Sequence, residues 1–308
     1  MKPIKNFDLL IVGGGTAGMT AAIYAAKANI RAAIVESNIC GGLVNTTYIV
    51  ENFPSRKSIH GMDLVQKIQE QTELLGVTVD EAAEVTRLNL TDGMKEIETD
   101  EFLYRAPALV LATGRQPVPL EIDTHDCQEI HFCAICDGSI YKGKKVLVVG
   151  GGNSGFDEAY YLHSLGVKQI FLIEKMDRFS ALQSAQDKLL RCEGVTAMTS
   201  TIVEEIICEE KLRSVLLKNI ATGETQNISV DGVFVYMGQL PSNKLFADVV
   251  TLDADGYVIT GEEMETNISG VFAAGDIRSK KYRQITTAIG DGTIAALSAG
   301  EFLRNKKL

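Results

Sequence analysis

The sequence predicts an α/β fold with two Rossmann-like, three-layer (ββα) dinucleotide-binding domains, the second inserted into the first. Three observations lead to this prediction. A glycine-rich turn at 13–18 follows a short apolar strand, and a second such turn occurs at 150–155. Each turn precedes a helical pattern and a second strand that ends in an acidic residue. Between the two turns lies a Cys-x-x-Cys pair, Cys133 and Cys136.

The composition excludes several classes of protein. A chain of 308 residues can hold two domains with separate cores, and 45% hydrophobic residues with 28 glycines is typical of an α/β globule. The net charge of −10 argues against a nucleic-acid partner and against binding to an anionic membrane surface. No apolar run reaches the roughly 18 residues of a spanning helix, and the first residues lead directly into a strand, unlike a signal peptide.

The first module begins with a strand at 7–12. The turn contains Gly-x-Gly-x-x-Gly at Gly13, Gly15 and Gly18, and an alanine-rich helix follows before a strand that ends at Glu36. A helix is expected at about 61–75 and a β-meander at 77–104, with a turn at 91–93. A buried strand then ends at Gly114.

The same pattern recurs in the second module. A strand at 144–149, the turn at 150–155, a helix at 156–165 and a strand at 168–173 lead to Glu174, and a second meander at 203–230 leads to a strand ending at Gly238. The tail from 270 contains one strand and a long helix from about Gln284, so we expect it to complete the first module. The predicted domains are therefore 1–116 with 243–308, and 117–242, joined near 115–119 and 241–243.

Both glycine turns are typical of dinucleotide sites, because the backbone N–H groups at the start of a helix bind a pyrophosphate. One such turn can serve helix–strand packing alone. Two turns, with Glu36 23 positions after Gly13 and Glu174 24 positions after Gly150, argue for two dinucleotides.

A carboxylate at this position accepts a hydrogen bond from a ribose 2′-hydroxyl and repels a 2′-phosphate by about 1 to 4 kcal/mol. Glu174 therefore favours NADH over NADPH, unless it points to solvent and Lys175 or Arg178 binds a phosphate.

The Cys133–Cys136 spacing allows a disulfide that opens by thiolate attack through a mixed disulfide. Its position between two dinucleotide turns suggests that electrons pass from a pyridine nucleotide through a flavin to the cysteines. Asp137 could supply a proton to a leaving thiolate, although Asp-Gly is also a common turn element. Cys40, Cys127, Cys192 and Cys208 are interpreted as isolated thiols. No metal site and no disulfide framework are therefore predicted, and the cysteine usage indicates a cytoplasmic protein.

Taken together, these motifs resemble the low-molecular-weight thioredoxin reductases over nearly the whole chain. The matching segments are 13–18, 51–54, 112–114, 133–138, 150–155, 275–276 and 282–284. The resemblance implies a homodimer that contains FAD and reduces thioredoxin or a similar small dithiol protein. It also implies two alternating domain orientations, with hinges near Arg115 and Pro241.

The resemblance also assigns roles to residues. Cys136 would lie nearer the flavin, Cys133 would attack the thioredoxin disulfide, and Asp137 would be the acid. The FAD site would comprise Gly13, Gly15, Thr16, Ala17, Gly18, Glu36, Gly42, Asn52, Ala112, Thr113, Gly114, Gly275, Asp276, Arg283, Gln284 and Ile285. The NADH site would comprise Gly150, Gly152, Asn153, Ser154, Gly155, Glu174, Lys175 and Gly238.

The chain departs from the family pattern at the nucleotide site. The family's His-Arg-Arg and a further arginine, which bind the NADPH phosphate, are replaced by Glu174-Lys-Met176 and Ser180. Leu43 also replaces a glutamine that follows the paired glycines in the family. NADPH or reduced ferredoxin stays open as the donor, and a peroxiredoxin or a glutaredoxin-like protein as the acceptor. A redox-sensing flavoprotein without turnover is the remaining alternative.

Overall fold

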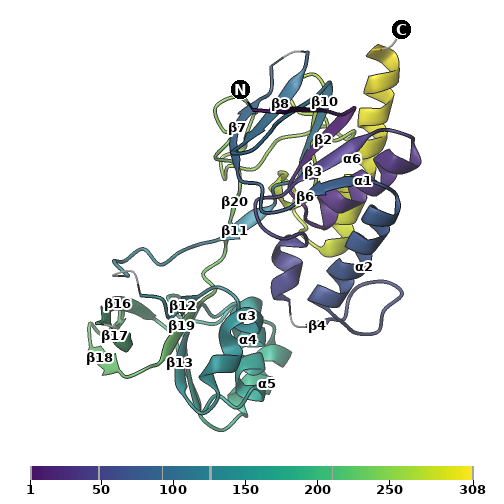
Figure 1. Cartoon of the computed structure of the whole chain (residues 1–308). Coiled ribbons are helices and arrows are strands. Elements are labelled where there is room, and N and C mark those ends of the chain that lie inside the picture. The colour runs from purple at the N-terminus through teal and green to yellow at the C-terminus, as the bar shows by residue number, and fades with distance from the viewer. Residues whose placement is uncertain (1, 48, 92, 125–126, 210, 307–308) are drawn as a thin grey trace. The chain divides into compact units, whose positions relative to one another are not determined.

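The computed structural model describes residues 2–47, 49–91, 93–124, 127–209 and 211–306. The chain forms two compact units (Figure 1): unit 1 comprises Met1–Gln116 and Leu240–Leu308, and unit 2 comprises Pro117–Gln239. The prediction of two Rossmann-like domains, one inserted into the other, is confirmed. The sequence placed the second junction three residues later, at 242/243, whereas the units divide at 239/240.

Unit 1 is built on a five-stranded parallel sheet with the order β21-β10-β2-β3-β6. Its strands are β2 (Leu9–Val12), β3 (Ala32–Val35), β6 (Thr78–Asp80), β10 (Ala108–Leu111) and β21 (Val271–Ala273). Strands this apolar need cover on both faces, and both are covered. Leu9 and Ile11 pack with the helices, whereas Leu10 and Val12 pack with a second sheet, which gives three layers.

The helical layer of unit 1 contains α1 and α6, which are packed against each other, and α2 beside α1. Their bounds are α1 (Thr16–Lys27), α2 (Gly61–Leu74) and α6 (Ile285–Lys306). At Gly292 of α6 a side chain would collide with the carbonyl of Ala17, so the two helices approach closely. Since β21 pairs with β10 and α6 packs on α1, the tail completes the first module as predicted.

The second sheet of unit 1 has the order β1-β9-β8-β7. Its strands are β1 (Ile4–Asn6), β7 (Val85–Asn89), β8 (Lys95–Thr99) and β9 (Leu103–Ala106). The predicted meander is therefore correct for β7 to β9 but wrong for β6, which joins the parallel sheet. Asp92, in the predicted turn, lies outside the described residues. Short elements complete the unit: η1 (Gly42–Thr46), β4 (Ile49–Val50), β5 (Ile59–His60) and η3 (Gly275–Ile277).

Unit 2 repeats this architecture. Its parallel sheet has the order β12-β19-β13-β14-β15, and an antiparallel sheet has the order β16-β17-β18. The strands are β12 (Ile130–His131), β13 (Lys145–Val149), β14 (Gln169–Ile173), β15 (Val195–Met198), β16 (Thr201–Cys208), β17 (Leu212–Asn219), β18 (Thr225–Ile228) and β19 (Gly232–Val235). The helical elements are α3 (Ala134–Asp137), η2 (Gly138–Tyr141), α4 (Asn153–Ser164) and α5 (Gln183–Leu190).

The two connections between the units are β11 (Arg115–Pro117) and β20 (Gln239–Pro241), which pair with each other. Among the described residues, no helix combines the length and the apolar character needed to span a membrane.

Candidate active site

The two glycine turns have the same backbone geometry. Gly13 and Gly150 have φ values of 102° and 118°, in the left-handed region that favours glycine. A side chain at either would collide with the carbonyl of the neighbouring strand end, that of Ala112 or Tyr236. Helix α4 also begins so close to its strand that a side chain at Gly155 would collide with the Gly150 carbonyl. These glycines are therefore required for packing, whether or not a ligand binds.

The acidic residues after the second strands bind the turns. In unit 1, Glu36 accepts hydrogen bonds from the N–H groups of Gly14 at 2.7 Å and Asn38 at 2.9 Å. In unit 2, Glu174 accepts them from Gly151 at 2.7 Å and Met176 at 2.9 Å. A carboxylate has about four lone-pair positions, so each retains capacity for a ribose hydroxyl. The alternative in which Glu174 points to solvent does not match this geometry.

The segment after Glu174 folds back over the second turn. The N–H groups of Ser180 and Ala181 donate to the Gly151 carbonyl at 3.0 and 3.2 Å. Asn153 accepts a hydrogen bond from the Leu182 N–H at 2.8 Å, so its side chain holds this segment in place. Lys175 is exposed on the same segment. Of the other residues predicted here, Gly152 and Ser154 lie at the start of α4, and Gly238, with a φ of 103°, follows β19.

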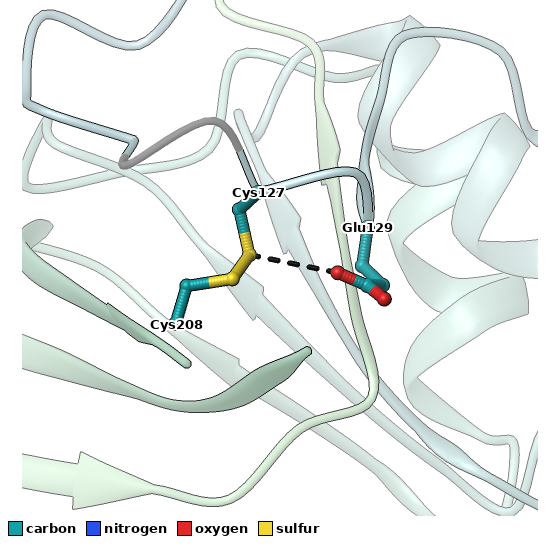
Figure 2. Close-up of side chains that lie close together, drawn as sticks. All are labelled: Cys127, Glu129 and Cys208. Carbon is teal, nitrogen blue, oxygen red and sulfur yellow. Dashed lines mark hydrogen bonds between the residues drawn. A yellow bond between two sulfur atoms is a disulfide. The ribbon is translucent and has the colours of Figure 1, made fainter. Parts of the chain in front are cut away.

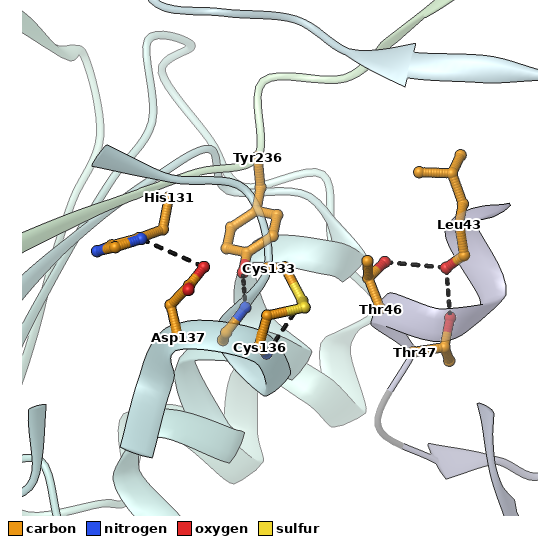
Figure 3. Close-up of a disulfide and its surroundings, with 9 residues drawn as sticks. Leu43, Thr46, Thr47, His131, Cys133, Cys136, Asp137 and Tyr236 are labelled. Carbon is orange, nitrogen blue, oxygen red and sulfur yellow. Dashed lines mark hydrogen bonds and ion pairs between the residues drawn. A yellow bond between two sulfur atoms is a disulfide. The ribbon is translucent and has the colours of Figure 1, made fainter. Parts of the chain in front are cut away.

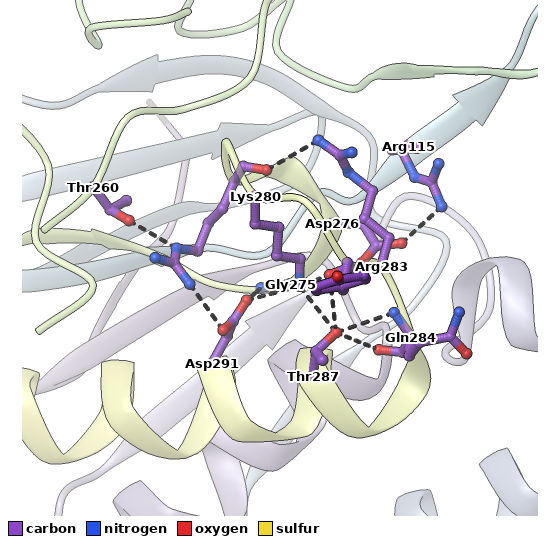
Figure 4. Close-up of polar contacts among 11 residues, drawn as sticks. Arg115, Thr260, Gly275, Asp276, Lys280, Arg283, Gln284, Thr287 and Asp291 are labelled. Carbon is purple, nitrogen blue, oxygen red and sulfur yellow. Dashed lines mark hydrogen bonds and ion pairs between the residues drawn. The ribbon is translucent and has the colours of Figure 1, made fainter. Parts of the chain in front are cut away.

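In unit 1, a buried carboxylate that the sequence analysis did not single out lies beside Gly275, one of the predicted flavin residues of the tail. Asp291 in α6 is 8% exposed and accepts a hydrogen bond from the Gly275 N–H at 3.1 Å. It also pairs with Arg278 at 2.8 Å and Lys280 at 2.9 Å (Figure 4). In the sequence, Asp291 could have been noticed because it is an acidic residue between two glycines, in a part of the helix formed mainly by small and apolar residues. Asp291 fixes the loop that enters α6.

Buried donors around this loop fit an acceptor-rich ligand. Asp276 pairs with Arg115 at 2.8 Å, and the Arg283 guanidinium lies 3.8 Å from the centre of the Tyr257 ring. The Nε atoms of Arg115 and Arg283 are buried without a hydrogen-bond partner among the described residues. Leaving a buried donor unpaired is unfavourable by about 1 to 3 kcal/mol, so a ligand with phosphate or carbonyl oxygens would stabilise them. The residues present therefore fit FAD.

The remaining predicted FAD residues lie around the same parts of unit 1. Asn52 donates a hydrogen bond to Gln284 at 3.1 Å, directly before the first residue of α6, Ile285. Thr113 donates to the Ser242 carbonyl at 2.7 Å. Thr16, Ala17 and Gly18 form the first turn of α1, Gly15 precedes it, Gly42 opens η1, and Ala112 and Gly114 follow β10.

The two cysteines of the Cys-x-x-Cys pair, Cys133 and Cys136, form a disulfide at the start of α3, with 5.4 Å between their Cα atoms. The Cys136 N–H donates to the Cys133 sulfur at 3.1 Å, and the Ala134 N–H donates to the Tyr236 hydroxyl at 3.0 Å (Figure 3). Cys133 is buried, whereas Cys136 is exposed. The arrangement can therefore stabilise negative charge on the inner sulfur while the outer one contacts a partner.

Asp137 pairs with His131, which in turn contacts Tyr141, and the sequence analysis missed both residues. His131 Nδ1 lies 3.2 Å from Asp137 Oδ2, and His131 Nε2 lies 2.6 Å from the Tyr141 hydroxyl. Burial raises the pKa of Tyr141 to about 12, so its O–H keeps its proton and donates to Nε2. Nδ1 then carries the imidazole proton and donates it to the Asp137 carboxylate. Burial also lowers the pKa of His131, against the opposing effect of Asp137, which favours the neutral ring.

Glu158 in α4 is a second titratable group that the sequence analysis missed. Burial, with a smaller effect from Asp157, raises its pKa to about 8, and its Oε2 has no hydrogen-bond partner among the described residues. Burial and then Glu158 raise the pKa of Tyr236, which holds the start of α3. An acidic residue on the inner face of an amphipathic helix was the only signal in the sequence.

One interpretation of the cysteines is wrong. Cys127 and Cys208 are not isolated, because they form a second disulfide within unit 2 (Figure 2). They are separated by 81 residues, so only the pairing of distant segments brings them together. The two free cysteines are Cys40, which is buried, and Cys192.

This geometry agrees with the comparisons to known proteins. The family model "Pyridine nucleotide-disulphide oxidoreductase" matches residues 7–292. The chain belongs to this family. Within the family, it is 36% identical over 309 residues to a thioredoxin reductase of Listeria innocua, covering 98% of this chain and 96% of that one.

Two further relatives extend the comparison. A Clostridium pasteurianum protein described as a "34.2 kDa protein in rubredoxin operon" is 40% identical, covering 99% of this chain and 100% of that one. The crystal structure of Lactococcus lactis thioredoxin reductase has a TM-score of 0.90 and 34% identity, and covers 97% of this chain and 99% of that one. The resemblance seen in the sequence is thus confirmed. This family member is a flavoprotein disulfide oxidoreductase of the thioredoxin reductase type, and the family implies FAD.

The raised pKa of Glu158 predicts a pH-dependent stability. The unfolded chain loses this proton near pH 4.5, whereas the folded chain holds it up to about pH 8, so this group lowers stability as pH rises through that window. We expect Glu158→Gln to raise the free energy of unfolding at pH 8 by about 1 to 3 kcal/mol and to change it little at pH 5. Urea unfolding at both pH values measures this. The exposed Glu193→Gln is the matched control, and an equal effect at both pH values would contradict the assignment.

Proposed function

We propose that this chain is an NADH-preferring, FAD-dependent disulfide reductase. In this proposal the Cys133–Cys136 pair reduces thioredoxin or a similar small dithiol protein. The observation that carries the proposal is the disulfide at the start of α3, on the same unit as a nucleotide-type turn closed by Glu174. We also propose that the protein acts as a homodimer in the cytoplasm. Sedimentation of the purified protein and fractionation of the source cells test these two statements.

FAD would be held in unit 1 by the glycine turn, Glu36 and the loop that Asp291 fixes. When bound, it would supply the two-electron transfer between nucleotide and disulfide. The chain's own residues perform the exchange with the partner. The Cys136 thiol gives its proton to the Asp137 carboxylate, and the resulting thiolate attacks the partner disulfide and forms a mixed disulfide. The partner thiolate that is released takes this proton from Asp137. Cys133 then attacks Cys136, re-forms their disulfide and releases the second partner thiolate.

The exposure of the two residues supports Cys136 as the attacking residue. Cys133 is 8% exposed and accepts a hydrogen bond from the Cys136 N–H, which suits a resolving thiolate. This order is the reverse of the one that the family resemblance implies. Asp137 is half-buried next to Cys136, and His131, whose Nδ1 lies 3.2 Å from its carboxylate, would orient it for the proton transfer.

The NADH preference depends on Glu174. Its carboxylate lies against the turn that would hold the pyrophosphate, where a ribose 2′-hydroxyl is an acceptable neighbour and a 2′-phosphate is repelled. Lys175 and Arg178 are exposed and lie beyond this carboxylate in the chain.

Reduced ferredoxin is the second candidate donor. One observation favours it: the basic residues that bind the NADPH phosphate in the family are absent here. The intact turn at Gly150 and its Glu174 contact speak for a nucleotide instead.

The first prediction concerns the donor. In stopped-flow experiments on the FAD-containing protein, we expect NADH to bleach the flavin at least about tenfold more efficiently than NADPH. Glu174→Gln should reduce this ratio by about fivefold, because the charge is lost while an acceptor oxygen is kept. Glu193→Gln is the control. Preference for NADPH, or bleaching by reduced ferredoxin alone, would contradict the donor assignment.

The second prediction concerns the order of the cysteines. Both Cys133→Ser and Cys136→Ser should abolish turnover with thioredoxin, since each removes one half of the dithiol. Only Cys133→Ser keeps the exposed thiol, so we expect it to trap a mixed disulfide with oxidised thioredoxin at least about tenfold more than Cys136→Ser. Non-reducing gels with peptide mass mapping measure the yield. Trapping by Cys136→Ser alone would restore the family's order, and turnover by either variant would refute the dithiol.

The third prediction concerns His131. His131→Ala removes the donor that orients Asp137, so we expect thiol–disulfide turnover to fall about tenfold and its pH profile to change shape. Reduction of the bound flavin by NADH should stay within about twofold. Phe132→Ala, at an exposed neighbouring position, is the control. If the rate falls at every pH by the same factor, with the profile unchanged, His131 acts only in packing.

A further inference from the structure

The second disulfide joins two distant parts of unit 2. Cys127 lies shortly before β12, and Cys208 is the last residue of β16 (Figure 2). Both cysteines are half-buried at the margin of the core between the parallel and antiparallel sheets. The bond is separate from the Cys133–Cys136 pair and takes no part in the mechanism above.

The disulfide holds the segment that leads to the active-site helix. Leu120 and Ile122 pack onto the same core as Cys127 and Cys208. Four residues after Cys127, His131 makes its contacts with Asp137 and Tyr141. Opening the bond would therefore release one end of the segment that places this network.

A carboxylate lies beside the bond. Glu129 Oε2 is 3.6 Å from the Cys127 sulfur and is held there by the Leu212 N–H at 3.3 Å. A disulfide sulfur carries no hydrogen, so this is a contact in the oxidised state and becomes a possible S–H hydrogen bond only after reduction. Cys127, Glu129 and Cys208 bring three potential metal-ligand atoms within 4.8 Å, but the bonded sulfurs offer no thiolate to a metal.

We propose that Cys127–Cys208 is a second thiol–disulfide exchange site, which small thiols and dithiols open slowly because Glu129 repels the attacking thiolate. Attack on Cys127 would bring an anion next to this carboxylate. Attack on Cys208 would release a Cys127 thiolate beside it. Both routes are therefore slowed by the same charge.

The exchange balances with a dithiol as the reductant. One thiolate of the dithiol attacks a sulfur of the bond, forms a mixed disulfide and releases the other cysteine, which takes a proton from solvent. The second thiol of the reductant loses its proton to solvent and displaces the remaining cysteine, which also takes a proton from solvent. The products are one oxidised cyclic disulfide, the Cys127 thiol and the Cys208 thiol, with two electrons transferred.

The experiment follows each disulfide by alkylation and peptide mass mapping. The FAD-containing protein is first equilibrated with oxidised dithiothreitol, and we expect a Cys127–Cys208 linked peptide after digestion without reductant. Recovery of both residues as alkylated thiols would overturn the site. With dithiothreitol, the Cys133–Cys136 pair should open at least about tenfold faster than Cys127–Cys208. Equal rates would overturn the proposed protection.

The charge of the attacking thiol tests the role of Glu129. At equal thiolate concentration, we expect cysteamine to open Cys127–Cys208 faster than 2-mercaptoethanol, and 2-mercaptoethanesulfonate to be slowest. Glu129→Gln keeps an acceptor for the Leu212 N–H and should reduce the ratio between cysteamine and 2-mercaptoethanesulfonate by about fivefold. Glu121→Gln removes an exposed charge from the same segment and should leave that ratio unchanged. An unchanged ratio in Glu129→Gln would overturn the proposal. The exchange at Cys127–Cys208 requires neither the nucleotide nor the protein partner. The proposed function could therefore be wrong while the assignment of this site is correct.

Discussion

The close approach of a helix to the strand before it is the constraint on which both units depend. At Gly150 and Gly155 the backbone of turn and helix leaves no room for a side chain, and Gly13 and Gly18 repeat the arrangement. This approach directs the first N–H groups of the helix toward a single point, where an anion is stabilised. The carboxylates of Glu36 and Glu174 then hold the turns through Gly14 and Gly151. Packing and ligand chemistry thus make the same demand on these residues.

Local patterns in the sequence were sufficient for most of the fold. The Gly-x-Gly-x-x-Gly spacing, the acidic residue after the second strand and the Cys133–Cys136 spacing each describe contacts within one supersecondary unit, so they can be read directly. Thr78–Asp80 was misassigned because a short strand carries no mark that distinguishes a parallel edge from a meander. The tail was assigned correctly since it held one strand and one helix, too little for a core of its own.

The residues that the sequence did not reveal make contacts between distant segments. Asp291 reaches back to Gly275 and Lys280 across the loop that enters α6. Cys127 meets Cys208 only because the segment before β12 lies beside the end of β16. His131 and Tyr141, which contact each other, precede and follow the dithiol helix in the chain. They lie in a strand of two residues and in a short turn, and such short elements leave no periodic pattern in the sequence. The composition of the chain carries no information on which distant segments lie side by side.

Tyr236 connects the two parts of the candidate site in unit 2. Its carbonyl lies against Gly150, its N–H donates to the Val149 carbonyl at 2.7 Å, and its hydroxyl accepts a hydrogen bond from Ala134 at 3.0 Å. One residue therefore contacts both the nucleotide turn and the first residue of the dithiol helix. Because α3 has a single turn and little stability of its own, its position follows that of Tyr236. Burial and then Glu158 raise the pKa of Tyr236, so its hydroxyl keeps its proton where it accepts the hydrogen bond from Ala134.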